Sequence, residues 1–369
     1  MIIRRGRERG GPGASWTELL LRPFCFKGLL PMRVFITGGT GLIGRNLIAR
    51  LLERGDQPVV VSRKADEARR RPAMRQAQIV QGDPSERGAW EEAVDGCDAV
   101  VNLVGHNLFA DRWGPTVKRK IRDSRVYSTE HVVTAMAKAR SRPKVLVQAS
   151  AIGYYGPHGD EELTESSPSG SDFMAVVCRE WEDAGRAAES QGVRVAAVRT
   201  GVVLARDEAA LGVMTPIYKW LPGGAAPVGG ASSSFKPGNG SQWMSWIHID
   251  DIVGIFLLAL DNEAAAGAIN GTAPHPVHHV DFGRTLAKVL WRPFIPIGPP
   301  DAALELLLGE VAHVVTKGQK VLPAKALELG YKFKYPEILP ALTAIFATAK
   351  PEASKAAAKP KEHSHAGHH

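Results

Sequence analysis

The sequence predicts an α/β protein built on a doubly wound parallel sheet, with a smaller α/β lobe toward its C-terminus. Short Val-rich apolar runs alternate with longer helical patterns between about residues 34 and 203, which is the pattern of repeated βαβ units. A glycine-rich motif stands between the first apolar run and the first helical pattern. From about residue 204 the alternation gives way to clusters of Gly and Pro, which predicts the smaller lobe.

Five apolar runs are expected as strands of the sheet. They are rich in Val, as parallel strands buried on both faces usually are, and they span residues 34–36, 59–61, 99–103, 145–148 and 195–198. A further strand is expected before Gln81. Between the first two runs, Leu and Ile recur on one helical face over residues 42–52, and Gly55 then acts as a stop signal for that helix.

Composition excludes several classes of protein. A hydrophobic fraction of 44% with 23% charged residues is typical of a globular protein, which excludes disorder as the dominant state. Three widely spaced cysteines, Cys25, Cys97 and Cys178, form neither a disulfide framework nor a Cys-x-x-Cys metal site. They fit a reducing compartment, and we expect a cytoplasmic protein. No apolar run approaches the ~20 residues of a membrane span, so no membrane partner is expected.

The net charge of +8 lies mainly at the two ends of the chain. Residues 1–31 and 350–369 together hold six of the eight excess positive charges, so the body is close to neutral and no nucleic-acid partner is expected. Residues 1–31 are expected to be a disordered arm or an incorrectly assigned start before Met32. The alternative is an Arg-rich targeting leader. The tail, 350–369, ends in a His-rich tract that is able to bind metal. We expect a solvated tail and assign no metal.

The strongest motif is a phosphate-binding loop between the first strand and the first helix. It reads Gly-x-x-Gly-x-x-Gly at Gly38, Gly41 and Gly44. Glycines permit the tight turn, let backbone N–H groups approach a pyrophosphate, and let the helix pack closely on the strand, while the helix N-terminus favours the phosphate charge. The alternative is a glycine-rich turn without a ligand. The strand before the motif and the helix after it favour a Rossmann-like fold that binds a dinucleotide.

The end of the second strand favours NADP(H) over NAD(H). An NAD site places an acidic residue ~20 residues after the glycine motif, where it binds the ribose 2′-hydroxyl. This chain has Ser62, Arg63 and Lys64 there, and the first carboxylate is Asp66. The guanidinium of Arg63 matches the geometry of a 2′-phosphate; the alternative is a solvated loop residue. Asp83, after the third strand, is a candidate partner for the adenine amino group.

These signals predict how the chain is organised. We expect an NADP-binding Rossmann domain over residues 32–203, joined by a returning segment at about 241–275. A smaller C-terminal lobe that binds substrate is expected over 204–240 and 276–349, and the arm and the tail flank these parts. The substrate is expected between the carboxyl edge of the sheet and this lobe.

The motifs together resemble the extended short-chain dehydrogenase/reductases, the NAD(P)-dependent epimerase/dehydratase-like proteins. The resemblance covers about residues 32–346 and fits the "epimerase family protein" subgroup, which ends in a domain of unknown function. Besides the glycine motif and Asp83, the segments that carry it are Asn102-Leu103-Val104-Gly105, Arg112-Trp113, Ser124-Arg125, Ser150-Ala151-Ile152-Gly153-Tyr154-Tyr155-Gly156, Arg199-Thr200-Gly201-Val202-Val203-Leu204, Trp246-Ile247-His248-Ile249-Asp250-Asp251, Gly318-Gln319-Lys320-Val321-Leu322-Pro323 and Gly330-Tyr331-Lys332-Phe333. A longer Gly/Ser segment, 231–239, departs from the family pattern.

The resemblance implies a small-molecule substrate and an extended cofactor site. The cofactor contacts that it implies are Gly38, Thr40, Gly41, Leu42, Ile43, Gly44, Ser62, Arg63, Asp83, Asn102, Leu103, Val104, Gly105 and Arg125, with Val202 near the nicotinamide. Asp250 and Asp251 are expected to be structural, because a carboxylate before the helix at 252–260 is able to accept its unpaired N–H groups.

The catalytic pair of the family is absent from this chain. Extended reductases use a Tyr-x-x-x-Lys pair with a Ser or Thr, and the tyrosine exchanges a proton as the hydride moves. In the corresponding helix, Met174 stands for the tyrosine and Cys178 for the lysine if Glu182 aligns with the acidic residue that follows the lysine. A shift by one residue gives Phe173 and Val177, so neither register restores the pair. Cys178 is expected to be a small buried hydrophobe.

Other side chains are candidates to replace the missing pair. Ser150, Tyr154 and Tyr155 follow the fifth strand, and Arg125 is a candidate for the missing positive charge. Packing is the alternative role of the two tyrosines. We therefore expect an NADP(H)-binding oxidoreductase or epimerase that acts on an unidentified small substrate. The alternative is a sensor or scaffold that binds NADP(H) with little turnover. No oligomeric state is predicted.

Overall fold

The computed structural model describes residues 31–220, 240–294, 306, 310 and 317–347. The chain falls into two units, Met1–Pro31 and Met32–His369, and the fold belongs to the second unit. Residues 1–30 of the arm, Cys25 among them, lie outside the described residues. So do the Gly/Pro clusters between 222 and 239, the Gly/Ser segment 231–239 and the His-rich tail. Among the helices in these described ranges, none combines the length and the hydrophobicity that a membrane-spanning segment requires.

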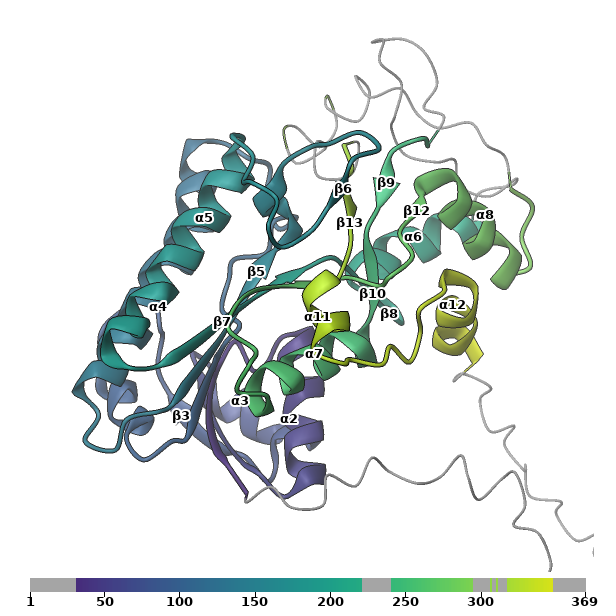
Figure 1. Ribbon diagram of the computed structural model, residues 1–369. Helices are drawn as coiled ribbons and strands as arrows, with labels where there is room; N and C mark the ends of the chain where they lie inside the picture. Colours follow the sequence, from purple (N-terminus) through teal and green to yellow (C-terminus); the bar gives the residue numbers. More distant parts are fainter. Residues whose placement is uncertain (1–30, 221–239, 295–305, 307–309, 311–316, 348–369) are drawn as a thin grey trace, which may run out of the picture. The chain divides into compact units, whose positions relative to one another are not determined.

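The core is a seven-stranded parallel sheet, shown in Figure 1, with the strand order β11-β7-β5-β4-β1-β2-β3. The order reverses between β1 and β4, which is where a doubly wound sheet opens a crevice for a ligand beyond its carboxyl edge. The predicted fold class and the predicted strands are confirmed. The strands are β1 (Arg33–Thr37), β2 (Gln57–Ser62), β3 (Gln78–Gln81), β4 (Ala99–Asn102), β5 (Val145–Ala151), β7 (Arg194–Thr200) and β11 (Gly267–Gly271).

Helices cover both faces of the sheet, because alternate residues of each strand point to opposite faces. Val34 and Ile36 of β1 pack in the apolar cluster with α2 (Leu42–Arg54) and α7 (Ile249–Asp261). Phe35, between them, packs in the cluster with α4 (Pro115–Lys138), and α5 (Phe173–Arg186) lies against α4 (Figure 1). Shorter elements join these layers: α3 (Ala65–Arg70) and the 3-10 turns η1 (Pro72–Met74), η2 (Ala89–Val94), η3 (Ile152–Tyr155) and η4 (Ala187–Gln191).

The first helix ends where the sequence predicts. Gly55 follows α2 in the left-handed conformation, with φ of 90°, and its N–H group donates to the carbonyl groups of Leu51 and Leu52. A residue with a Cβ atom is strained at such a φ, so glycine is the residue that closes this helix at little cost. The stop signal at Gly55 is confirmed.

The C-terminal part builds a further apolar cluster from small paired strands and helices. β8 (Val202–Ala205) pairs with β10 (Trp246–His248), β9 (Trp243–Met244) with β12 (Val277–His278), and β6 (Glu162–Leu163) with β13 (Lys320–Val321). Leu204, Trp246 and Phe282 share one cluster with residues of the last helix. The helices here are α6 (Ala209–Trp220), α8 (His279–Val289), α11 (Ala324–Glu328) and α12 (Ile338–Ala347). The predicted division into a domain and a lobe stays a prediction.

The start of α7 differs from the expectation. His248, not an aspartate, caps this helix, because its Nδ1 atom accepts a hydrogen bond of 3.0 Å from the N–H group of Asp250. Asp251 is structural, but its carboxylate faces the C-terminal stretch: it accepts from the backbone N–H groups of Lys334, at 2.7 Å, and Tyr335, at 2.9 Å. The expected cap role of Asp250 and Asp251 is therefore wrong, since both lie within the first turn of the helix.

Candidate functional site

The three glycines of the phosphate-binding loop have different environments. Gly38 has φ of 64°, and a Cβ atom on it would lie 2.7 Å from the backbone of Leu103. A Cβ atom on Gly44 would lie 2.6 Å from the carbonyl oxygen of Gly38. Gly41 is exposed, and a Cβ atom there would meet a single neighbour, the Gly38 oxygen at 3.3 Å. Gly38 and Gly44 thus make the turn and the close packing, and Gly41 leaves the backbone open to a ligand.

The N-terminus of α2 is ready to bind an anion. Gly41 caps the helix without a side-chain hydrogen bond, and the first turn contains no acidic residue. Among the described residues, the N–H groups of Leu42, Ile43 and Gly44 therefore have no side-chain acceptor, and the helix dipole adds positive potential at this end. These residues fit the pyrophosphate of a dinucleotide.

The strand ends next to the loop are held by a buried polar chain. The hydroxyl of Thr37 donates to Oδ1 of Asn102 at 2.5 Å, and Nδ2 of Asn102 donates to the hydroxyl of Thr129 at 2.8 Å. The N–H group of Leu103 donates to the Thr37 hydroxyl at 3.2 Å. Asn102 is fully buried, so its side chain fixes the ends of β1 and β4. Leu103, Val104 and Gly105 then continue past the carboxyl edge of the sheet.

The end of β2 presents Arg63 to solvent. The side-chain amide of Gln81 holds this turn from both sides, because its Oε1 accepts from the N–H group of Ala65 at 3.0 Å and its Nε2 donates to the carbonyl of Arg63 at 2.9 Å. Ser62 is buried, and its hydroxyl accepts from the N–H group of Lys64. The backbone is thus fixed while the side chain of Arg63 stays exposed.

A second arginine, which the sequence reasoning missed, reaches the phosphate-binding loop. Nη1 of Arg71 donates to the carbonyl of Thr40 at 3.0 Å, and its Nη2 donates to Glu67 at 3.0 Å. Arg71 follows α3 directly. The only signal in the sequence is the basic run at 69–71, which by pattern alone indicates a solvated helix end.

Asp83 follows β3, and Val202 is the first residue of β8. Asp83 is half-buried and accepts from both the N–H group and the hydroxyl of Ser85, at 3.0 and 2.7 Å. Val202 begins β8, and its N–H group donates to the carbonyl of Ser245. The cofactor contacts assigned to these and to the other residues of the site stay predictions.

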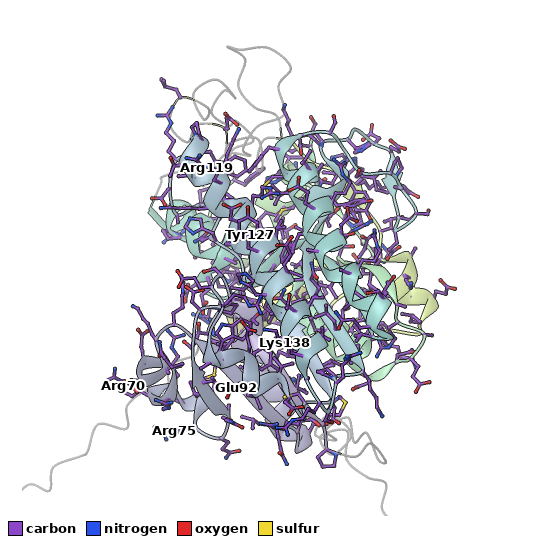
Figure 2. The ribbon with its side chains drawn as sticks, turned by 90° about the vertical axis from the view of Figure 1, so that its left-hand side faces the viewer. Arg70, Arg75, Glu92, Arg119, Tyr127 and Lys138 are labelled. Carbon is purple, nitrogen blue, oxygen red and sulfur yellow. The ribbon has the colours of Figure 1, made fainter. Side chains whose placement is uncertain are left out.

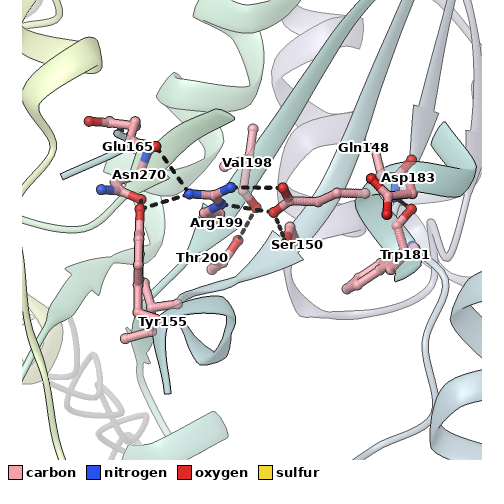
Figure 3. A network of polar contacts seen from close by, with 12 residues as sticks. Gln148, Ser150, Tyr155, Glu165, Trp181, Asp183, Val198, Arg199, Thr200 and Asn270 are labelled. Carbon is pink, nitrogen blue, oxygen red and sulfur yellow. Dashed lines mark hydrogen bonds and ion pairs between the residues drawn. The ribbon is translucent and has the colours of Figure 1, made fainter. Parts of the chain in front are cut away.

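Two of the three candidate catalytic residues belong to a buried polar network, shown in Figure 3. The hydroxyl of Ser150 donates to Glu182 at 2.6 Å, and the same carboxylate takes two hydrogen bonds from Arg199, both at 2.9 Å. Nη1 of Arg199 donates at 3.0 Å to the hydroxyl of Tyr155, which donates at 2.7 Å to Asn270. All five side chains are buried, so the network joins β5, α5, β7 and β11 beneath the carboxyl edge.

The two tyrosines differ in their surroundings. Burial raises the pKa of Tyr155 to about 12, which keeps its phenol protonated at neutral pH. Tyr154 is half-buried, and its ring centroid lies 3.4 Å from the guanidinium carbon of Arg199. Such a stack holds the ring by a cation–π interaction. The catalytic roles of Ser150, Tyr154 and Tyr155 stay predictions.

Met174 and Cys178 face the turn that follows β5. A Cβ atom on Gly153 would lie 3.4 Å from Cβ of Met174 and 3.8 Å from Sγ of Cys178. Burial raises the pKa of the Cys178 thiol to about 12, so the thiol is neutral and buried, as expected. The positions of the missing tyrosine and lysine, in the register set by Glu182, thus hold two apolar side chains against η3.

Arg125 extends from α4 toward the loop after β4. It donates to the carbonyls of Ile121 and His106, at 2.9 and 3.2 Å, and its guanidinium carbon lies 5.2 Å from the ring of Trp181. Within the described ranges it has no carboxylate partner, and a Cβ atom on Gly105 would lie 3.1 Å from its guanidinium carbon. Burial lowers the pKa of Arg125, because an unpaired charge is costly where water is excluded.

Comparisons with known proteins agree with this geometry. Residues 34–270 match the NAD dependent epimerase/dehydratase family, and residues 299–345 match a domain of unknown function, DUF1731. The chain is similar to the epimerase family protein SDR39U1 homolog of Arabidopsis thaliana, described as chloroplastic, with 44% identity over 85% of this chain and 86% of the relative. Its identity to the epimerase family protein YfhF of Bacillus subtilis is 35%, over 86% and 99% of the two chains. A crystal structure of human epimerase family protein SDR39U1 with NADPH shares 33% identity, with a TM-score of 0.73 over 86% of this chain and 100% of that one.

Proposed function

This chain belongs to the NAD dependent epimerase/dehydratase family of NAD(P)-binding proteins, and we propose that it uses NADP(H) as an oxidoreductase or epimerase acting on a small substrate. The observation that carries the choice of cofactor is the exposed Arg63 at the end of β2. An NAD site places a carboxylate at that point, whereas this chain presents a guanidinium. The resemblance to the human protein solved with NADPH supports the same choice.

Two arginines support recognition of a 2′-phosphate. The turn at the end of β2 is held through the backbone carbonyl of Arg63, and the side chain of Arg63 is exposed. The guanidinium of Arg71 reaches the phosphate-binding loop through its hydrogen bond to the carbonyl of Thr40. A hydrogen bond to a charged group contributes about 1.5–3 kcal/mol. Loss of one such contact therefore weakens NADPH binding by roughly 10- to 100-fold, because each 1.4 kcal/mol is tenfold in affinity.

Fluorescence titration with NADPH and NADH tests this proposal. We expect the wild-type protein to bind NADPH more tightly than NADH, and Arg63→Glu to lose most of that preference. Arg70→Gln is the matched control, since Arg70 is exposed on α3 and projects into solvent in Figure 2. Equal affinity of the wild-type protein for the two cofactors would contradict the proposal for Arg63.

A sensor or scaffold that binds NADP(H) with little turnover is the second candidate function. It is favoured by the absence of a Tyr-x-x-x-Lys pair in α5 and by the bonds that hold Ser150 and Tyr155 inside the protein. The two functions differ in whether bound NADPH is consumed. Oxidation of NADPH in the presence of a panel of aldehydes and ketones, followed at 340 nm, supports the enzyme, and its absence across the panel supports the sensor.

A further inference from the structure

Hydride transfer to a carbonyl needs a group that protonates the carbonyl oxygen. In this chain the hydroxyl of Ser150 already donates a hydrogen bond to Glu182, and the hydroxyl of Tyr155 donates one to Asn270. The helix that would hold the usual Tyr-x-x-x-Lys pair has neither residue, whether Met174 and Cys178 or Phe173 and Val177 stand in their places. Tyr154 is half-buried and stacks on the guanidinium of Arg199. A further candidate for the proton donor lies elsewhere along the carboxyl edge of the sheet.

His106 stands at that edge, one residue after Gly105 and four after the end of β4. Its backbone is held from both sides by consecutive residues of α4. Its N–H group donates to the hydroxyl of Ser124 at 2.9 Å, and its carbonyl accepts from Arg125 at 3.2 Å. The loop beyond it is held as well, because the indole N–H of Trp113 donates to the carbonyl of Leu108 at 2.8 Å. The backbone that carries the imidazole is thus held in place, just beyond the carboxyl end of β4 where the strand order reverses.

The two nitrogens of the His106 ring have different surroundings. Nε2 is buried without a hydrogen bond and lies 3.7 Å from Oδ2 of Asp111. Nδ1 makes no hydrogen bond in the part of the chain that the structure describes. A carboxylate that faces one ring nitrogen orients an imidazole, while the other nitrogen stays available to exchange a proton. Contacts of this kind are often long before a substrate binds and shorten in the complex.

We propose that His106 is the proton-transferring residue of this protein and that Asp111 positions it. The inference rests on the proposed hydride transfer with NADP(H). The carbonyl carbon of the substrate accepts the hydride that the reduced cofactor supplies, and the carbonyl oxygen takes a proton from Nδ1 of the His106 imidazolium. The substrate is reduced to an alcohol, the cofactor is oxidised, and the neutral imidazole then regains a proton from water. The reverse reaction uses the neutral imidazole as the base.

The first test needs no substrate. The nicotinamide ring is charged in NADP⁺ and neutral in NADPH, so a side chain beside it experiences a different field in the two complexes. We expect the Cε1–H signal of His106, identified in the NMR spectrum by its loss in His106→Gln, to move when NADP⁺ replaces NADPH. His275 is the matched control, because it also faces a carboxylate, Glu337 at 3.4 Å, but is exposed.

The second test measures turnover with a carbonyl compound that the wild-type protein reduces. General acid catalysis contributes typically 10²–10⁴-fold, so His106→Gln is expected to lower kcat by about 100-fold or more while NADPH affinity stays within about twofold. Asp111→Asn is expected to lower kcat by about tenfold with the same affinity, and His275→Gln is expected to change neither quantity.

The possible results separate this inference from the proposed function. If the wild-type protein fails to bind NADPH, the proposed function is wrong, and the proposed role of His106, which depends on it, is wrong too. If NADPH binds and the His106 signal is the same in both cofactor complexes, only the role of His106 is contradicted. Unchanged kcat in His106→Gln contradicts it too. A moving signal without turnover across the carbonyl panel supports the sensor and contradicts the proton transfer by His106.

Discussion

At the scale of single residues, the network around Arg199 shows that side chains of catalytic type, a serine and a tyrosine, form internal hydrogen bonds in this protein. The guanidinium of Arg199 forms a buried ion pair with Glu182, whose carboxylate also accepts a hydrogen bond from the hydroxyl of Ser150. Removing two charges from water is costly, and the pair is stable only while both partners and their hydrogen bonds are present. Ser150 and Tyr155, which the sequence suggests as catalytic residues, thus form hydrogen bonds with the two members of this internal ion pair.

Loss of one partner of this ion pair is expected to destabilise the protein strongly. Glu182→Gln leaves the charge of Arg199 buried without its counter-charge, and we expect the free energy of unfolding to fall by about 3–5 kcal/mol. Glu180→Gln is the control on the same helix: Glu180 pairs with Arg122 at 2.6 Å, but both side chains are 37% exposed. Such a partly exposed pair contributes about 1 kcal/mol or less. Urea denaturation measures both variants, and an equal loss in the two would show that burial of the pair does not matter.

At the scale of elements, the glycines of the phosphate-binding loop have different structural roles. Gly44→Ala brings a methyl group to 2.6 Å from the Gly38 carbonyl, and such overpacking costs about 1–3 kcal/mol. Gly41→Ala meets no close side chain and keeps an ordinary φ of −74°. Gly44→Ala therefore disturbs the packing inside the loop, whereas Gly41→Ala changes only the surface of the loop that faces a ligand.

These two substitutions are expected to separate folding from cofactor binding. We expect Gly41→Ala to keep the unfolding free energy within about 1 kcal/mol of the wild-type value but to weaken NADPH binding by at least tenfold, because its methyl group stands where a pyrophosphate approaches. Gly44→Ala is expected to lower both stability and binding. Gly114→Ala is the control: Gly114 also caps a helix, α4, and has no neighbour within 4 Å. Tight NADPH binding by Gly41→Ala would refute this account of the loop.

The secondary structure of the sheet follows from local patterns in the sequence. The Val-rich runs and the helical face over 42–52 are properties of short stretches, and they identify β1, α2, β2, β4, β5 and β7. The cap of α7 is not local in this way. Both Asp250 and Asp251 are suitable capping residues by type, but α7 begins at Ile249, so the carboxylates lie inside the helix and His248 takes the cap.

At the scale of the whole molecule, Asp251 attaches the C-terminal stretch to the helix layer of the sheet. Its carboxylate accepts from the N–H groups of Lys334 and Tyr335 and, at 3.2 Å, from the hydroxyl of Tyr331. These partners lie about 80 residues away along the chain. A single buried side chain therefore couples the order of the C-terminal elements to α7.

Removal of this carboxylate is expected to loosen the C-terminal stretch before the sheet. In Asp251→Ala the backbone N–H groups of Lys334 and Tyr335 lose their acceptor, whereas the Tyr331 hydroxyl keeps its bond to the Asp251 carbonyl. Each unpaired buried group costs about 1–3 kcal/mol. We expect hydrogen exchange to speed up over residues 331–347 while β1 and β4 keep their protection. Asp250→Ala removes only the partly exposed pair with Lys334, so it is expected to leave exchange nearly unchanged. Uniform acceleration across the protein in Asp251→Ala would show that the contact does not act locally.

The sequence by itself determined the strands of the sheet, the phosphate-binding loop and the basic residue at the end of β2 that favours NADP(H). These features depend on periods of two and 3.6 residues and on glycine spacing, which are set within about ten consecutive positions. Only the tertiary structure decided that Arg71 reaches Thr40, that Ser150 and Tyr155 serve an ion pair, and that His106 faces Asp111 from a clamped backbone. Most of those contacts join residues that are far apart in the sequence, and all depend on which polar groups packing brings together once water is excluded. No local pattern encodes that choice.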